Sequence, residues 1–154
     1  GKPMSTILDF MGGDHRACDD LFAAAEDAAA QKNWDSARSL FERFQAAMAH
    51  HLAMEEKILF PAFEARTGMS MGPTQVMRME HGQMRDLIQE MAGAVASADH
   101  DRYLGLSETL NMLMQQHNLK EENVLYPMTD QVLGGELDDL LRSMEAVSTE
   151  PEAP

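Results

Sequence analysis

The segment HHLAMEEKILFP, residues 50–61, returns 66 residues later as QHNLKEENVLYP, residues 116–127. Both copies contain His-x-x-x-Glu-Glu, followed by a leucine, an aromatic residue and a proline. The same offset relates His15 to His81, and each of these lies 36 residues before the histidine of its motif. Many apolar positions differ between the halves, whereas the imidazoles and carboxylates stay in register. This pattern is typical of a metal site with internal two-fold symmetry.

The composition indicates one helical domain. The chain has 154 residues, of which 44% are hydrophobic and 25% charged, as in ordinary globular proteins. Methionine and alanine are abundant while β-branched residues are few, which favours helix over strand. The net charge of −14 argues against nucleic acid or an anionic membrane as a partner, because both require basic patches.

Two further features concern localisation. No apolar stretch approaches the ~20 residues of a membrane span, so we expect no membrane insertion. The single cysteine, Cys18, cannot form an intramolecular disulfide and fits a reducing compartment. We therefore expect a cytoplasmic protein. Gly1-Lys2-Pro3 before Met4 resembles a remnant of cloning and does not enter the fold prediction.

Apolar residues recur at helical spacing in four segments, each about 25 residues long or slightly longer, joined by short connections. This predicts an all-α, up-down-up-down four-helix bundle with an internal repeat at an offset of 66 residues. Gly134-Gly135 should break the chain before a short C-terminal fifth helix over 137–147. We assign residues 5–147 to this single domain, and expect residues 1–4 and 148–154 to be disordered or cloning-derived.

Glycine and proline predict the local interruptions. Gly12-Gly13 should loosen a turn of the first helix just before His15. Pro61 lacks a backbone donor, so the second helix should kink there or end within a few residues, and Gly68 should close it. Pro73 should occupy the first turn of the third helix.

A histidine and the glutamate four residues later lie on one helix face, so each half contains a preassembled pair of metal ligands. The other two helices provide one imidazole each. Four imidazoles and two carboxylates suit a pair of iron, manganese or zinc ions, with the carboxylates bridging them. Without a bound cation, burying these groups would cost several kcal/mol. The predicted ligands are His15, His51, Glu55, His81, His117 and Glu121.

Other repeated residues surround this set. Glu56 and Glu122 are rotated about 100° from the ligand face, so we expect them to be exposed or to support the ligands from outside. Asp14 and Glu80, each directly before a single histidine, are interpreted as acids on the helix surface, with orientation of an imidazole from outside as the alternative. Four methionines at helical spacing from the histidines should line the pocket as packing residues: Met11, Met48, Met77 and Met114.

In this order, the motifs resemble the hemerythrin-like family of HHE cation-binding domains over about residues 5–130. The resemblance rests on Asp14-His15-Arg16, His51-x-x-x-Glu55-Glu56, Glu80-His81 and His117-x-x-x-Glu121-Glu122, with Leu59-Phe60-Pro61 and Leu125-Tyr126-Pro127. It implies a non-heme di-iron centre bridged by two carboxylates and an oxo or hydroxo group. The implied iron ligands are His15, His51, Glu55, His81, His117 and Glu121.

Two departures from the oxygen-carrying members bear on function. These members have a further histidine one turn before the third-helix ligand, where this chain has Met77. Their fourth-helix acid also follows its histidine by five residues, not the four that separate His117 from Glu121. The four-histidine, two-glutamate set is more similar to bacterial members that repair iron centres and handle nitric oxide.

We therefore expect a di-iron protein that binds or reacts with O2, NO or peroxide, in sensing, scavenging, iron storage or iron-centre repair. One alternative is an oxidoreductase that turns over NO or peroxide with an unknown electron donor. Another is a bundle in which metal only stabilises the fold. Whether the protein is an enzyme, and its oligomeric state, stay open. A ferritin-like site would need Glu-x-x-His, and a structural zinc site would normally contain several cysteines.

Overall fold

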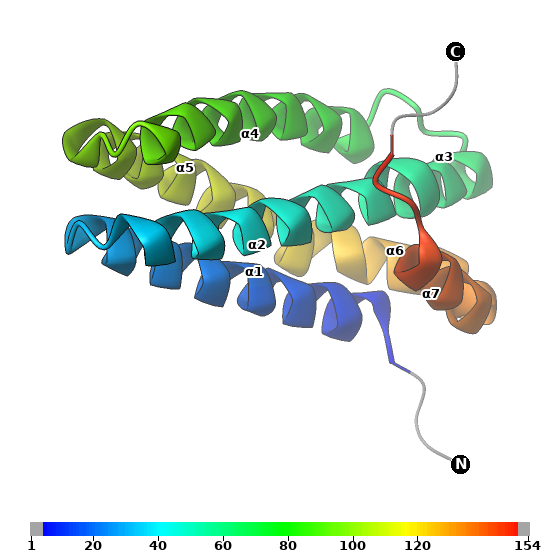
Figure 1. The fold of residues 1–154 in the computed structure, drawn as a ribbon. Helices are drawn as coiled ribbons and strands as arrows, with labels where there is room; N and C mark the ends of the chain where they lie inside the picture. Colours follow the sequence, from blue (N-terminus) through cyan, green and yellow to red (C-terminus); the bar gives the residue numbers. More distant parts are fainter. Residues whose placement is uncertain (1–4, 151–154) are drawn as a thin grey trace.

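The computed structural model describes residues 5–150, which form a bundle of antiparallel helices without any β-strand in that range (Figure 1). The predicted all-α architecture is confirmed. The elements are α1 (Ile7–Ala30), α2 (Trp34–Ala53), the π-helical turn η1 (Met54–Leu59), α3 (Phe60–Thr67), α4 (Pro73–Ala96), α5 (His100–Lys120), the π-helical turn η2 (Glu121–Leu125), α6 (Tyr126–Leu133), the 3-10 turn η3 (Gly134–Glu136) and α7 (Leu137–Ala146).

The predicted terminal segments are described only in part. Residues 1–4 and 151–154 lie outside the described residues. Residues 148–150 follow α7 without helical structure. There, Lys57 Nζ donates to the backbone carbonyls of Ser148 and Glu150 at 2.9 and 2.7 Å, so this short segment runs beside η1.

The α1–α2 and α4–α5 turns lie at the same end of the bundle and have the same geometry (Figure 1). Lys32 and Ala98, related by the 66-residue offset, both have a positive φ, of 59° and 54°. In each turn, the residue after the positive-φ residue donates its N–H to the carbonyl five residues earlier. These bonds run from Asn33 to Ala28 and from Asp99 to Ala94, both at 2.9 Å. These are Schellman-type helix ends. The internal repeat therefore extends to backbone conformation.

The second and fourth helices of the bundle do not end at their prolines. Pro61 and Pro127 each occupy the first turn of a helix, α3 or α6, that continues the preceding one through a π-helical turn. Phe60 N–H bonds to the carbonyl of Glu55, and Tyr126 N–H to that of Glu121, five residues back. The helix thus passes Pro61 through a change of helical register, where we expected a kink or an end within a few residues. Gly68, at φ 72°, closes α3 as predicted.

The prediction that Gly12-Gly13 loosens a helical turn is wrong, because α1 runs through these residues without interruption. Tertiary contacts hold this helix at its start. Asp130 of α6 accepts hydrogen bonds from the backbone N–H groups of Ile7 and Leu8 at 2.6 and 3.1 Å. Two of the N–H groups that a helix N-terminus leaves free are thereby satisfied.

Apolar side chains form two clusters along the bundle axis. One cluster, near the α1–α2 and α4–α5 turns, includes Phe41, Phe44 and Tyr103. The other lies between the opposite helix ends and α7, and includes Phe63 and Met144. Between them, buried histidines and glutamates occupy one polar layer of the core. Within residues 5–150, no helix is both long and apolar enough to cross a membrane.

Candidate metal centre

All six predicted ligand residues meet in this polar layer, and none is more than 4% exposed. One donor atom from each of four residues lies within 4.8 Å of the others, and a second group overlaps the first. Since α1, α2–η1, α4 and α5–η2 all contribute, the site closes only when the whole bundle forms. The two groups are Glu55, His81, His117 and Glu121, and His15, His51 and Glu121.

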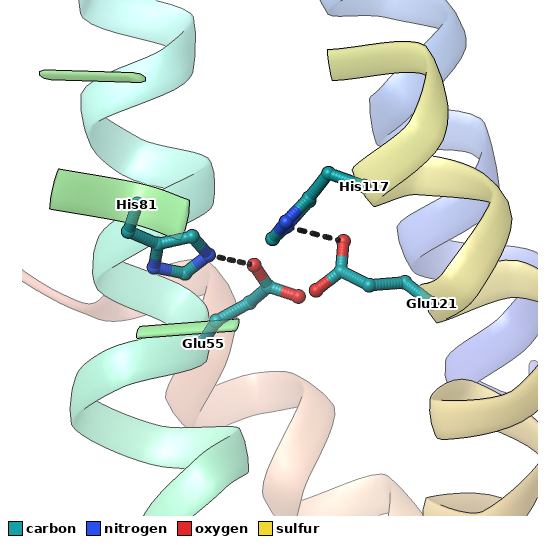
Figure 2. Close-up of side chains that lie close together, drawn as sticks. All are labelled: Glu55, His81, His117 and Glu121. Atoms are coloured by element: carbon teal, nitrogen blue, oxygen red, sulfur yellow. Dashed lines mark hydrogen bonds and ion pairs between the residues drawn. The ribbon is translucent and has the colours of Figure 1, made fainter. Parts of the chain in front are cut away.

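Each glutamate contacts imidazoles from both halves of the chain. Glu121 Oε1 lies 3.1 Å from His15 Nε2 and 3.3 Å from His117 Nε2. Glu55 Oε1 makes the repeat-related contacts, at 3.0 Å from His81 Nε2 and 3.6 Å from His51 Nε2. Figure 2 shows the two carboxylates facing each other, with His81 beside Glu55 and His117 beside Glu121. Each carboxylate thus lies between an imidazole of the first half and an imidazole of the second half.

A second set of carboxylates holds the imidazoles from outside. Every ligand-set histidine directs Nε2 into the layer and donates its Nδ1 hydrogen to an acid at 2.7–3.0 Å. Such an arrangement fixes the ring orientation and the tautomer. The pairs are His15 with Glu122, His51 with Asp14, His81 with Glu56, and His117 with Glu80.

The interpretation of Asp14 and Glu80 as surface acids is therefore wrong, and the alternative, that they orient an imidazole from outside, is confirmed. Their position directly before a histidine of their own helix obscured their role, because each serves the histidine of the next helix along the chain. Glu56 and Glu122 do support ligands from outside, but they reach across to the opposite half. The repeat at an offset of 66 residues was the available signal, since all four acids obey it.

Two of the outer acids also carry a cationic partner. Arg85 donates to both carboxylate oxygens of Glu56, at 2.7 and 2.9 Å, and Lys120 donates to Glu80. Burial acts to raise the pKa of Glu56, but the hydrogen bonds from His81 and Arg85 prevail and lower this pKa to about 2. The Glu56 carboxylate is therefore ionised and a strong acceptor near neutral pH.

The carboxylates shift the histidine pKa values upward. Burial alone would lower the pKa of His15, but its hydrogen bonds to Glu121 and Glu122 outweigh burial and raise this pKa to about 9. Burial likewise lowers the pKa of His81, but its hydrogen bonds to Glu55 and Glu56 outweigh burial and raise this pKa to about 9. Without metal, these imidazoles are cations that compensate the carboxylates.

The two central carboxylates titrate as a pair. Burial, followed by the charge of Glu121, raises the pKa of Glu55. Burial acts likewise on Glu121, but its contacts with Glu55, His117 and His15 hold the pKa of Glu121 well below the ordinary range. In the metal-free chain Glu55 thus retains a proton to a higher pH, while Glu121 remains the anion.

Tyr126 is a member of the site that sequence reasoning missed. Its buried hydroxyl group donates to Glu55 Oε2 or Glu121 Oε1, at 2.8 and 2.9 Å, and lies 3.2 Å from His15 Nε2. Burial and the nearby charges of Glu55 and Glu121 raise the pKa of the phenol well above its usual value. The π turn brings this hydroxyl inward, because it places Tyr126 over Glu121, five residues earlier.

The predicted methionine lining is divided between the two sides of the polar layer. Met48 and Met114 line a cavity of about 10 Å3 beside three of the imidazoles, together with Cys18 and Met84. Met11 and Met77 are buried in the apolar cluster on the side of α7. Burial raises the pKa of the Cys18 thiol to about 12, with smaller contributions from nearby acids, so it remains protonated.

The donor set fits a metal. His117 Nε2 and Glu121 Oε2 are buried without a hydrogen-bond partner, because the 3.3 Å contact from His117 to the other Glu121 oxygen is poorly aligned. Unsatisfied buried polar atoms are rare, and a cation would satisfy both. Imidazole nitrogen and carboxylate oxygen are donors that iron, manganese and zinc accept. His50 and His100, which do not repeat, are absent from both ligand groups.

The antiparallel bundle, with its internal repeat and its buried layer of histidines and glutamates, defines a helical protein with a candidate metal centre. The hemerythrin HHE cation-binding domain model matches residues 6–129. The chain belongs to this family, as the resemblance of its motifs indicated. No solved structure gives a match to the chain.

Two curated relatives share the name iron-sulfur cluster repair protein YtfE. The protein from Dickeya chrysanthemi (strain Ech1591) is 33% identical over 90 residues, covering 52% of this chain and 40% of the relative. The protein from Edwardsiella ictaluri (strain 93-146) is 34% identical over 87 residues, covering 50% and 39%. The match thus spans about two-fifths of the length of these relatives.

Proposed function

We propose that the chain holds a non-heme di-iron centre. One iron would be bound by His15 and His51 and the other by His81 and His117, with two glutamates, Glu55 and Glu121, shared between them. When bound, the iron pair supplies Lewis acidity and reversible electron transfer to a small ligand. Manganese and zinc are the substitutes that this donor set also accepts.

The observation that carries this proposal is the span of each central carboxylate. Glu121 contacts His15 and His117, which belong to different halves, and Glu55 does the same with its own pair. In a site for one metal, no carboxylate would have to belong to two donor groups. Here Glu121 belongs to both groups. Carboxylates placed between two sets of imidazoles are the arrangement of a dinuclear site in a helical bundle.

The space beside the histidines supports a ligand of very few atoms. The cavity of about 10 Å3 bordered by His15, His51 and His117 is close to the volume needed for one water molecule. Its other walls are chiefly apolar or sulfur-containing, with Asp19 and Asn118 as the remaining polar members. A cavity of this size supports a ligand of one or two heavy atoms, such as O2, NO or peroxide, over an organic substrate.

The biological role that we propose is handling of iron or of a diatomic ligand during repair of iron centres. The name that the two relatives share, iron-sulfur cluster repair protein, supports this role, and the family match over residues 6–129 includes all six proposed ligands. The role places the chain in a reducing compartment such as the cytoplasm, in keeping with its single cysteine. Steady turnover of NO or peroxide at the same centre is the second candidate, favoured by the cavity beside the histidines.

Metal content after anaerobic loading with ferrous iron tests the centre. We expect about two irons per chain and, when air is admitted, near-ultraviolet absorption of an oxo-bridged ferric pair. Glu55→Ala and Glu121→Ala should each lose most of the bound iron. His50→Ala is the matched control, because this residue lies next to a ligand but outside the site, and it should retain both irons. One iron per chain or none would refute the proposal.

Two assays separate the roles. Repair predicts that the iron-loaded protein restores cluster absorption in an NO-damaged iron–sulfur protein, without continuous NO consumption. Turnover predicts continuous loss of NO or peroxide in the presence of a chemical reductant. Both activities should disappear in Glu121→Ala and persist in His50→Ala. If neither activity is observed with two irons bound, the metal serves the stability of the bundle.

A further inference from the structure

The hydroxyl of Tyr126 lies at the place where a metal would bind on the side of α1 and α2. Its oxygen is 3.2 Å from His15 Nε2 and 3.4 Å from His51 Nε2, the two imidazoles of that position. It is also 2.9 Å from Glu121 Oε1 and 2.8 Å from Glu55 Oε2. One phenol oxygen therefore faces both imidazoles of this position and both central carboxylates, and the residue is fully buried.

The repeat removes this oxygen from the other position. Tyr126 corresponds to Phe60, which packs against His81 with ring centroids 5.7 Å apart, as Tyr126 packs against His15 at 5.6 Å. Both residues are 0% exposed and both follow a π turn. Phe60 differs from Tyr126 chiefly in having no oxygen. The two metal positions are related by backbone and by histidine ligands, but only one has a phenol.

The donor groups show the same inequality. Glu55, His81, His117 and Glu121 form a group of four donors, whereas the group around His15 has three. An additional oxygen beside the smaller group would bring both to four. Phenol oxygen is an established donor to ferric iron in proteins, as in tyrosine-ligated haem.

We propose that the Tyr126 oxygen is a ligand of the metal held by His15 and His51. This inference rests on the proposed two-metal centre. On metal binding the phenol proton is released to the buffer, as protons are from other metal ligands, because the cation compensates the charge that remains. The position of His81 and His117 has no phenol, because its repeat-related residue is Phe60.

Two substitutions of one oxygen atom test the inference. Tyr126→Phe removes the hydroxyl, and Phe60→Tyr adds one at the repeat-related place as the matched control. Each variant is loaded with iron and oxidised, its iron is counted, and its visible absorption and resonance Raman spectra are recorded. Circular dichroism verifies that the helical content is unchanged.

We expect the wild type to show a phenolate-to-iron(III) charge-transfer band and enhanced tyrosine ring vibrations. Both signals should vanish in Tyr126→Phe, with at least about tenfold weaker binding of one of the two metals. Phe60→Tyr should keep both signals. Two irons per chain without the band, or a band that survives in Tyr126→Phe, would overturn the ligand assignment while leaving the di-iron centre intact. Fewer than two irons in the wild type would overturn the centre itself.

Discussion

At the scale of single residues, the site has an inner set of candidate metal ligands and an outer set of acids that hold the histidines. Imidazole Nε2 atoms and two carboxylates face inward, while Nδ1 atoms face four outer acids. The inner set could be predicted from sequence, because His51 and Glu55 are four residues apart on one helix. The outer set could not, because its acids contact histidines on other helices, and that depends on how the helices pack. Tyr126 was missed because only the π turn directs its hydroxyl inward.

The outer set of acids predicts a graded effect of mutation. Glu56→Gln keeps a hydrogen-bond acceptor for His81 but removes the charge that polarises the ring. We expect two metals per chain to persist, with about 10–100-fold weaker affinity for one of them. Titration with cobalt(II), followed by absorption, measures this difference. Glu42→Gln, at an exposed position of α2, is the control and should bind like the wild type.

Protonation predicts how the metal-free chain responds to pH. The pKa values of His15 and His81 are raised to about 9 in the folded chain, against 6.5 when unfolded. Because the folded pKa is the higher one, the stabilisation is complete below pH 6.5 and is lost as pH rises through 9. Each histidine contributes up to roughly 3 kcal/mol.

Urea unfolding of the metal-free protein between pH 6 and 10 measures this loss. The free energy of unfolding should fall steadily across the range. A constant value up to pH 9 would contradict the assignment of these histidines as cations in the folded, metal-free chain.

At the scale of elements, helices and their ends were predicted well and changes of helical register were not. Apolar spacing identifies an amphipathic helix, and Gly68 closes α3 because only a positive φ fits there. The π turns before Pro61 and Pro127 were not predicted, because proline alone indicates only a kink or an approaching helix end. Here the helix instead adopts the wider hydrogen-bonding pattern, which keeps both the glutamate and the aromatic residue facing the core.

The repeated turn geometry predicts a stabilising substitution. Ala98 has a positive φ of 54°, a conformation that a residue with a Cβ atom adopts at a cost. Ala98→Gly should therefore raise the free energy of unfolding by about 0.5–1 kcal/mol. Ala23→Gly, at an exposed position inside α1, should lower it by about 1 kcal/mol. Thermal unfolding of both variants gives the comparison, and equal signs would contradict the prediction.

At the scale of the whole molecule, the polar layer lies across the middle of an otherwise apolar core. One apolar cluster lies on each side of this layer. Helix α7 covers the cluster farther from the α1–α2 turn through Leu137, Leu141 and Met144. All four long segments of the bundle contribute residues to the proposed ligand set, so metal bound there would be linked to the stability of the folded chain. Composition and periodicity were enough to predict this architecture, because they report which faces are buried.

This linkage predicts a stabilising effect of metal on the entire fold. At a free metal concentration 100 times the dissociation constant, each site adds about 2.7 kcal/mol to the free energy of unfolding. For a chain of this size, we expect the unfolding temperature to rise by roughly 5–10 °C per occupied site. Scanning calorimetry with ferrous iron, and again after a chelator, measures the shift. An unchanged temperature on chelation would show that no metal had bound the native state.

The crossed pairing of acids and histidines has a consequence for the ancestry of the chain. A single helical hairpin, taken as the first half alone, could form only the pair of Asp14 with His51. His15 would lack its acid and Glu56 its imidazole, because their partners lie in the second half. Two identical hairpins side by side would restore every pair. An ancestor of half this length would thus have needed to dimerise, and gene duplication with fusion would have turned that dimer into one polypeptide.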